Sequence, residues 1–272
     1  MAQGLALTIG LNSVNPSHYQ GWSGPLNACE ADADDMADMA ISRGFTCTKL
    51  LTKDGSRAAV KSVLADAARR LKAGDIFFLT YSGHGGQLPD LNGDEADRND
   101  ETWCLYDGEL VDDELYTAFG AFAAGVRIIM LSDSCHSGTV SKDFYYRKQA
   151  SAGAPVAYRA MPNEVALRVY QKNKEFYDPI LKARDTAKAL AAVKASILLI
   201  SGCHDNQLSL DGTFNGLFTG TMKSVWNGGT FEGSYTRFHK AIRSKMPPDQ
   251  TPQLSMVGTI DRRFTAQTPF TI

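Results

Sequence analysis

Two glycine-rich segments of the sequence each carry a side chain suited to nucleophilic catalysis. Residues 82–86 read Ser-Gly-His-Gly-Gly, and residues 132–138 read Ser-Asp-Ser-Cys-His-Ser-Gly. A free thiol has a pKa of about 8.5 and is mostly protonated at neutral pH, so a cysteine nucleophile needs a nearby imidazole. We therefore interpret His84 and Cys135 as a candidate catalytic pair. The glycines beside them allow the N–H groups of Gly85 and Cys135 to form an oxyanion hole.

Parallel strands are the elements that must position these two segments. Short apolar runs predict buried strands, and stretches with helical spacing lie between them, which is typical of a parallel sheet covered on both faces. The predicted fold is a three-layer α/β/α sandwich with a mostly parallel central sheet. In such sheets ligands bind at the carboxyl ends of the strands, where residues 82–86, 132–138 and 202–207 fall. The predicted strands are Leu5–Gly10, Thr46–Leu51, Ile76–Tyr81, Val126–Leu131 and Ile197–Ser201, and the predicted helices are Ala28–Ser42, Arg57–Lys72, Asp112–Ala123 and Gly216–Trp226.

A basic segment from about residue 139 to residue 195 interrupts this pattern. It holds eleven Lys or Arg residues against five Asp or Glu residues and contains no run rich in strand-forming residues. Helices are predicted at Pro162–Lys174 and Pro179–Lys194, each with proline in the first position. We interpret the 272 residues as one domain with this segment inserted between two strands of its sheet.

The overall composition excludes several classes of protein. The formal net charge is −2, which does not favour a nucleic-acid partner. No apolar run reaches the roughly 18 residues of a membrane helix, and the first residues lack the pattern of a signal peptide, so a soluble cytoplasmic protein is expected. The five cysteines are widely spaced and form no CxxC pair, which indicates reduced thiols.

The two glycine-rich segments resemble the catalytic motifs of metacaspases, of the bacterial or type I-like kind that includes orthocaspases. Residues 81–87, Tyr-Ser-Gly-His-Gly-Gly-Gln, and residues 133–138 carry the resemblance, and residues 201–207 and 249–255 are also similar to family segments. The 51-residue separation of His84 and Cys135 agrees with the spacing of about 50 in caspases. The resemblance implies a caspase-like fold, a monomer, and a cysteine endopeptidase that cleaves protein or peptide substrates after Arg or Lys.

A pocket for a basic side chain needs a carboxylate, because a buried guanidinium without one loses its solvation. The resemblance assigns this pocket (S1) to Cys29, Asp32, Ser82 and Asp133. Asp205 lies at a strand end and either joins the pocket or caps a turn. Asp32 has the alternative of a solvated acid near a helix N-terminus, and Asp133 the alternative of orienting His84.

An acidic stretch at residues 90–101 raises the question of calcium, because clustered oxygen ligands suit hard cations. The resemblance implies Ca²⁺ ligands at Asp100, Asp112 and Asp113, with a fourth shortly after the catalytic cysteine. That fourth position holds Lys142, and Asp143 follows it. The alternative is a solvated acidic loop in which Asp112 caps the following helix. No organic cofactor is expected.

The expected chemistry is acyl transfer, in which the Cys135 thiolate attacks the carbonyl carbon after Arg or Lys and His84 handles the protons. No third residue that orients His84 is evident, which is typical of a dyad. With its basic residues, the insertion is a candidate for self-cleavage, for shielding the pocket, or for binding a partner. Two rival functions are a peptidase that cleaves after Asp, which needs a basic pocket, and a caspase-fold scaffold without activity.

Overall fold

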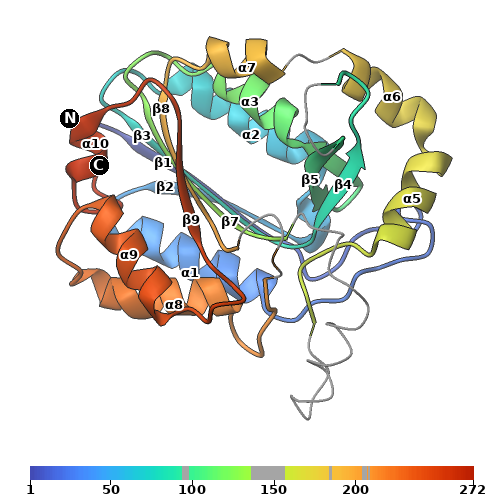
Figure 1. Ribbon diagram of the computed structural model, residues 1–272. Coiled ribbons are helices and arrows are strands. Elements are labelled where there is room, and N and C mark those ends of the chain that lie inside the picture. Colours follow the sequence, from blue (N-terminus) through green and yellow to red (C-terminus); the bar gives the residue numbers. More distant parts are fainter. Residues whose placement is uncertain (94–97, 136–156, 184–185, 204–206, 208) are drawn as a thin grey trace.

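A six-stranded sheet forms the centre of the molecule (Figure 1). The computed structural model describes residues 1–93, 98–135, 157–183, 186–203, 207 and 209–272. Five strands of the sheet are parallel, and the last runs antiparallel to its neighbour. The strands, in the order of the sheet, are β2 (Thr46–Leu51), β1 (Gly4–Gly10), β3 (Ile76–Ser82), β7 (Arg127–Asp133), β8 (Ser196–Ser201) and β9 (Gln253–Gly258).

Helices cover both faces of this sheet, which confirms the three-layer α/β/α architecture (Figure 1). One face carries α2 (Arg57–Arg70), α3 (Asp112–Phe119) and α7 (Thr186–Ala192), and the opposite face carries α1 (Cys29–Ser42), α8 (Leu217–Trp226) and α9 (Tyr235–Lys245). The short helix α10 (Arg262–Ala266) lies near the two chain termini.

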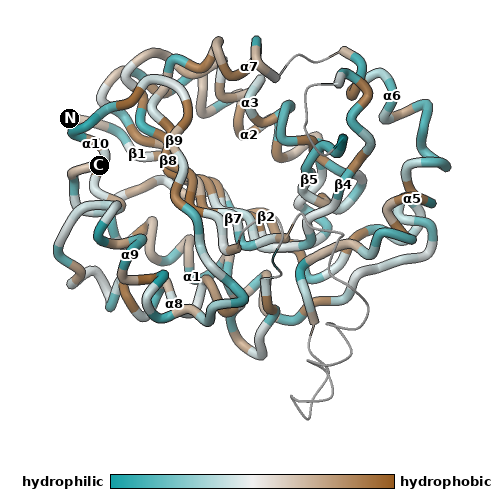
Figure 2. Tube along the Cα trace, in the orientation of Figure 1, coloured by the Kyte–Doolittle hydropathy of each residue, from teal (hydrophilic) through white to brown (hydrophobic). Residues whose placement is uncertain are grey.

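Strand β3 shows why the sequence folds in this way. All seven of its residues are buried, and successive side chains point to opposite faces of the sheet. Phe77, Leu79 and Tyr81 pack in the core under α2 and α3, whereas Ile76 and Phe78 pack in the core on the α1 and α8 side. A continuous apolar run is therefore needed to fill both cores, as Figure 2 shows by the hydrophobic colour of the central strands.

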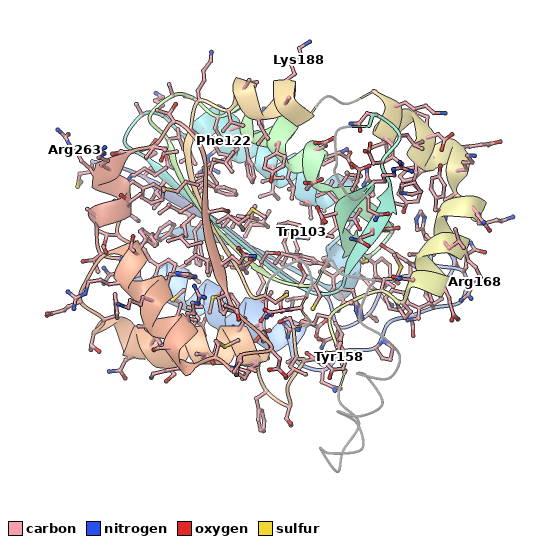
Figure 3. The ribbon with its side chains drawn as sticks, in the orientation of Figure 1. Trp103, Phe122, Tyr158, Arg168, Lys188 and Arg263 are labelled. Atoms are coloured by element: carbon pink, nitrogen blue, oxygen red, sulfur yellow. The ribbon has the colours of Figure 1, made fainter. Side chains whose placement is uncertain are left out.

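A second, three-stranded antiparallel sheet lies at one end of the main sheet and was not predicted. Its strands are β4 (Gly85–Pro89), β5 (Asn99–Leu105) and β6 (Gly108–Val111), in that order. Trp103 of β5 joins it to the main sheet, because its ring stacks on Tyr81 at 4.4 Å between centroids and its Nε1–H donates to Ser132 Oγ at 3.1 Å. Figure 3 shows Trp103 directed into the interior.

The described part of the basic insertion contains three helices: α5 (Asn163–Lys172), α6 (Lys174–Lys182) and α7. The helix predicted at Pro162–Lys174 is present as α5. The prediction of a second helix that begins at Pro179 is wrong. Pro179 lies inside α6, where Tyr177 and Leu181 are buried four residues apart on one face. That apolar pair sets the position of α6 through packing, which outweighs the preference of proline for the first helical position. Among the described helices, none combines the length and the hydropathy that spanning a membrane requires.

Candidate active site

The carboxyl ends of β3 and β7 lie side by side, with Ser82 paired to Asp133 in the register. His84 follows β3, and Cys135 follows β7. The parallel pairing therefore brings the two glycine-rich segments to one edge of the sheet, as their positions after predicted strands indicated.

A backbone carbonyl orients the His84 imidazole. The Nε2 atom lies 2.9 Å from the carbonyl oxygen of Gly24, and the Trp22 ring packs against the imidazole at 4.7 Å between centroids. Because a carbonyl oxygen only accepts, Nε2 carries the hydrogen in the neutral ring and Nδ1 is the basic nitrogen. Nδ1 is buried and has no hydrogen-bond partner among the described residues.

Burial above all, together with the positive charge of Arg159, lowers the pKa of His84 to about 4, although hydrogen bonding to the backbone of Gly24 and Ala160 and the charge of Asp211 act in the opposite direction. The imidazole is therefore uncharged at neutral pH. An uncharged ring with its Nδ1 lone pair available is the form that can accept a proton from a thiol. The sequence analysis identified His84 but not the Gly24 carbonyl that orients it. Every residue has a backbone carbonyl, so the sequence does not indicate which one accepts this hydrogen bond.

The two N–H groups predicted as an oxyanion hole converge on a single carbonyl oxygen. Gly85 N–H donates to the carbonyl oxygen of Arg159 at 2.9 Å, and Cys135 N–H donates to the same atom at 3.1 Å. The Cys135 thiol is buried and contacts the backbone N–H and carbonyl of Ser209. The carbonyl carbon of Arg159 is thus held between the loops that carry the thiol and the imidazole.

Three carboxylates surround the guanidinium of Arg159. Its Nη2 lies 2.6 Å from Asp32 Oδ2 and 3.0 Å from Asp211 Oδ1, and its Nη1 lies 2.8 Å from Asp133 Oδ2. The Arg159 side chain is 0% exposed. Nη1 also donates to Ser82 Oγ at 2.6 Å. Burial lowers the pKa of Arg159, but the surrounding acidic groups, Asp133 first, raise it well above its usual value, so it stays charged.

Asp32 comes from the first turn of α1, where the helix dipole favours a negative charge. Burial raises the pKa of its carboxyl, as does the negative charge of Asp133, whereas Arg159 lowers it. Asp32 is buried, so its alternative as a solvated acid is wrong. Asp133 contacts Arg159, and His84 instead bonds to Gly24, so the alternative in which Asp133 orients His84 is also wrong.

Two of the remaining residues predicted for the pocket, Cys29 and Ser82, lie at the pocket, and the third lies outside the described residues. Cys29 is buried at the start of α1, and Arg159 acts on its thiol, partly offsetting the rise in pKa that burial causes. Ser82 bridges the pocket, because its hydroxyl accepts from Arg159 and donates to Asp32 at 2.7 Å. Asp205 lies outside the described residues.

Asp211 is the pocket residue that the sequence analysis missed. Besides contacting Arg159, its carboxylate accepts the backbone N–H groups of Asn27 at 2.7 Å and Ala28 at 3.3 Å, which lie at the start of α1. It therefore holds the two residues that lead into the helix that carries Asp32. The available signal was weak, since Asp-Gly at residues 211–212 is typical of a turn.

The predicted calcium ligands lie together only in part. Burial first, and then the negative charges of Asp113, Glu101 and Asp100, raise the pKa of Asp112 to about 8. Their oxygens are the donor type that Ca²⁺ prefers. Even so, no three His, Cys, Asp or Glu side chains of the described residues are placed to hold a metal ion together. Asp143 falls outside the described residues.

A mostly parallel sheet between helix layers, with a thiol and an imidazole on adjacent loops at its carboxyl edge, defines a protein of the caspase-like class. A family model described as Caspase domain matches residues 3–264. The chain belongs to the caspase-domain family.

Similar proteins include metacaspases and solved structures. Metacaspase-1 of Coccidioides immitis is 29% identical over 94% of this chain and 62% of its own length, and Metacaspase-1 of Kluyveromyces lactis is 31% identical over 94% and 66%. This chain thus spans less than two thirds of those two relatives. A crystallised protein of Geobacter sulfurreducens is 58% identical with a TM-score of 0.91, covering 99% of this chain and 98% of that one. Caspase-1 from Spodoptera frugiperda, at 10% identity and a TM-score of 0.52 over 94% of this chain and 86% of its own, shares the fold.

Proposed function

We propose that this chain is a cysteine endopeptidase that cleaves after Arg or Lys through His84 and Cys135. One observation carries the proposal: the carbonyl oxygen of Arg159 accepts two N–H groups while its guanidinium meets three carboxylates. A substrate arginine bound in the same way has its carbonyl carbon polarised by Gly85 and Cys135. The Cys135 thiolate then attacks that carbon, and His84 passes the proton to the leaving amine.

The pocket favours arginine over lysine in this proposal. The two terminal nitrogens of a guanidinium reach different partners, Asp32 and Asp211 on one side and Asp133 on the other. A lysine ammonium is a single point and cannot satisfy both sides at once. A substrate with Asp at this position would add a fourth carboxylate, so the rival specificity for Asp is disfavoured.

The test compares fluorogenic peptides that end in Arg, Lys or Asp, with wild type and Cys135→Ala. We expect hydrolysis in the order Arg above Lys, no hydrolysis after Asp, and no activity in Cys135→Ala. Hydrolysis that survives Cys135→Ala would remove the thiol mechanism. A folded wild type without activity on all three peptides would favour the scaffold function instead.

We also propose that Ca²⁺ stimulates the activity by binding through Asp100, Asp112, Asp113 and Asp143, the last of which lies outside the described residues. Besides burial, the negative charges of Asp113, Glu101 and Asp100 raise the pKa of Asp112, and this repulsion supports the proposal because a divalent cation would relieve it. The measurement is the hydrolysis rate over a calcium titration, with magnesium as the control cation, in wild type and Asp112→Asn. A response that is identical in the two proteins would rule out this site.

Self-cleavage within residues 139–195 remains part of the proposal.

A further inference from the structure

Residues 157–161 lie in the active site between two other segments, and isolated β-bridges join Tyr158 to Leu210 and Ala160 to Gly85 on either side of a bend at Arg159. On one side, Arg159 N–H donates to the Ser209 carbonyl at 3.1 Å, and Asp211 N–H donates to the Ala157 carbonyl at 3.0 Å. On the other side, Gly85 N–H donates to the Arg159 carbonyl at 2.9 Å and Met161 N–H donates to the Gly85 carbonyl at 2.8 Å. These main-chain hydrogen bonds hold the segment on both sides, and main-chain hydrogen bonds are also what holds a peptide in recognition by strand addition.

The side chains on either side of Arg159 are also buried. Tyr158 is 8% exposed and packs with Cys135 and Cys203. Met161 is 2% exposed and packs with Leu88 and its neighbours in the core beneath the small sheet. The segment therefore fills the arginine pocket and the predicted oxyanion hole, and it covers apolar surface beside the Cys135 thiol and beneath the small sheet.

We propose that this segment is the first substrate of the protease and that Cys135 cleaves the Arg159–Ala160 bond of its own chain. The inference rests on the proposed function and specifies where self-cleavage occurs. The Cys135 thiolate forms a bond to the Arg159 carbonyl carbon, the bond from that carbon to the Ala160 nitrogen breaks, and His84 donates a proton to the new amine. Water then adds its hydroxyl to the acyl carbon, releasing Arg159 as a carboxylate and returning a proton to the thiol or His84.

Two consequences follow for the intact chain. A pocket that holds Arg159 is closed to any other arginine, so hydrolysis of an added peptide begins only as the bond is cut. Cleavage frees the Arg159 end from its covalent link to α5, and the pocket can then exchange its occupant. The intact wild type is thus expected to show a lag in peptide hydrolysis that follows the appearance of the cut.

The test follows purified full-length protein by intact mass and N-terminal sequencing, with and without millimolar calcium chloride, while an Arg-terminated peptide reports activity. We expect wild type to yield the fragments 1–159 and 160–272, and Cys135→Ala to stay whole. Arg168→Gln is the matched control, because Arg168 is exposed on α5 and points away from the molecule (Figure 3). It is expected to be cut like the wild type.

Two variants separate the occupation of the pocket by Arg159 from the cleavage of the Arg159–Ala160 bond. Arg159→Gln removes the guanidinium, and we expect it to stay whole yet hydrolyse the peptide without a lag. Ala160→Pro keeps Arg159 in its pocket but turns the scissile bond into a crowded tertiary amide. We expect it to stay whole and to be at least about 100-fold slower, because the occupied pocket reduces the competent fraction of molecules. A cooperative thermal transition in each variant checks folding.

Different failures point to different errors. If wild type hydrolyses Arg peptides from the first minutes while its Arg159–Ala160 bond is intact, or if Arg159→Gln is cut as wild type is, the inference is wrong and the proposed function stands. If neither wild type nor folded Arg159→Gln hydrolyses any Arg peptide, the proposed function itself fails.

Discussion

The pocket around Arg159 holds more negative than positive charge. Three buried carboxylates surround one guanidinium, and the pKa of Asp32 is raised as a result of burial and of the charge of Asp133. Such a pocket is costly when empty, since buried carboxylates without a cation lose their solvation. In the proposed function, this excess of negative charge selects a substrate with a cationic side chain.

Asp211→Asn tests how much the third carboxylate contributes. A hydrogen bond to a charged group contributes about 1.5–3 kcal/mol, so we expect kcat/KM for Arg peptides to fall about 10- to 100-fold, mainly through KM. Lys peptides should lose less, because an ammonium cannot use all three acids, and the ratio of Arg to Lys hydrolysis should drop. Asp34→Asn, which alters an exposed acid on α1, is the control. Equal losses for the two peptides would show that Asp211 acts only by holding Asn27 and Ala28 before α1.

Gly24→Ala tests the carbonyl that orients His84. Gly24 has a φ of +51°, and a Cβ there would lie 2.8 Å from His84 Nε2 and 2.7 Å from the Trp22 ring. The added methyl must displace the imidazole, and we expect kcat to fall about 100-fold, the scale of a lost general base. Gly21→Ala is a matched control, since Gly21 has a φ of +87° with nothing within 4 Å of its Cβ position. Both variants should lose about 1 kcal/mol of stability, but a similar loss of kcat in both would refute the orienting role.

At the scale of elements, a buried ion pair fixes α3 against α2. Arg57 Nη2 lies 2.9 Å from each carboxylate oxygen of Glu114, and Lys61 also contacts Glu114. The Glu114 side chain is 1% exposed and that of Arg57 is 9% exposed. This pair positions the helix that begins at Asp112, beside the proposed calcium ligands.

Glu114→Gln should therefore destabilise the fold by about 3–5 kcal/mol, because it leaves the Arg57 charge buried with its main partner neutralised. Chemical denaturation followed by circular dichroism measures the change. Asp66→Asn breaks exposed pairs with Arg69 and Arg70 on α2 and should cost less than about 1 kcal/mol. A difference smaller than about 1 kcal/mol between the two variants would show that packing, not the ion pair, holds α3.

Elements whose cause is local were predictable from the sequence. The strand at residues 76–82 has apolar side chains on both faces, and it was predicted within one residue of its observed end. Strand β5 was missed, although Thr102-Trp103-Cys104-Leu105 is rich in strand formers, because the acidic residues before it drew the interpretation toward a metal-binding loop. Helix α6 was misplaced because its register depends on buried Tyr177 and Leu181 and not on Pro179.

At the scale of the whole molecule, the occupant of the active site was beyond sequence reasoning. Arg159 is one of eleven basic residues in its segment, and no feature of residues 157–161 separates it from the others. Its partners Asp32 and Asp211 lie 127 and 52 positions away. Only the folded topology brings those carboxylates together, so the insertion could be suspected of shielding the pocket but the residue that does so could not be named.

The Arg159–Ala160 bond divides the molecule into pieces that share both cores. The first piece supplies β1, β2, β3 and β7, and the second supplies β8 and β9, with β7 paired to β8 in the middle of the sheet. On the α1 side, Phe218 and Phe238 of the second piece pack in one core with Met36 and Phe78 of the first. Neither piece can bury its apolar side chains alone, so a cut there should leave one folded particle.

Co-expression of residues 1–159 and 160–272 as separate chains tests this independently of any self-cleavage. We expect the two chains to elute together in equal amounts, to separate only in denaturant, and to be insoluble when expressed singly. The control places Leu198→Asp in the second chain, where Leu198 is 1% exposed in β8, and should abolish the complex. Two chains that elute apart as folded species would contradict a shared core. Because Asp32 and Cys135 lie in one piece and Asp211 in the other, a stable complex should also keep the arginine pocket whole.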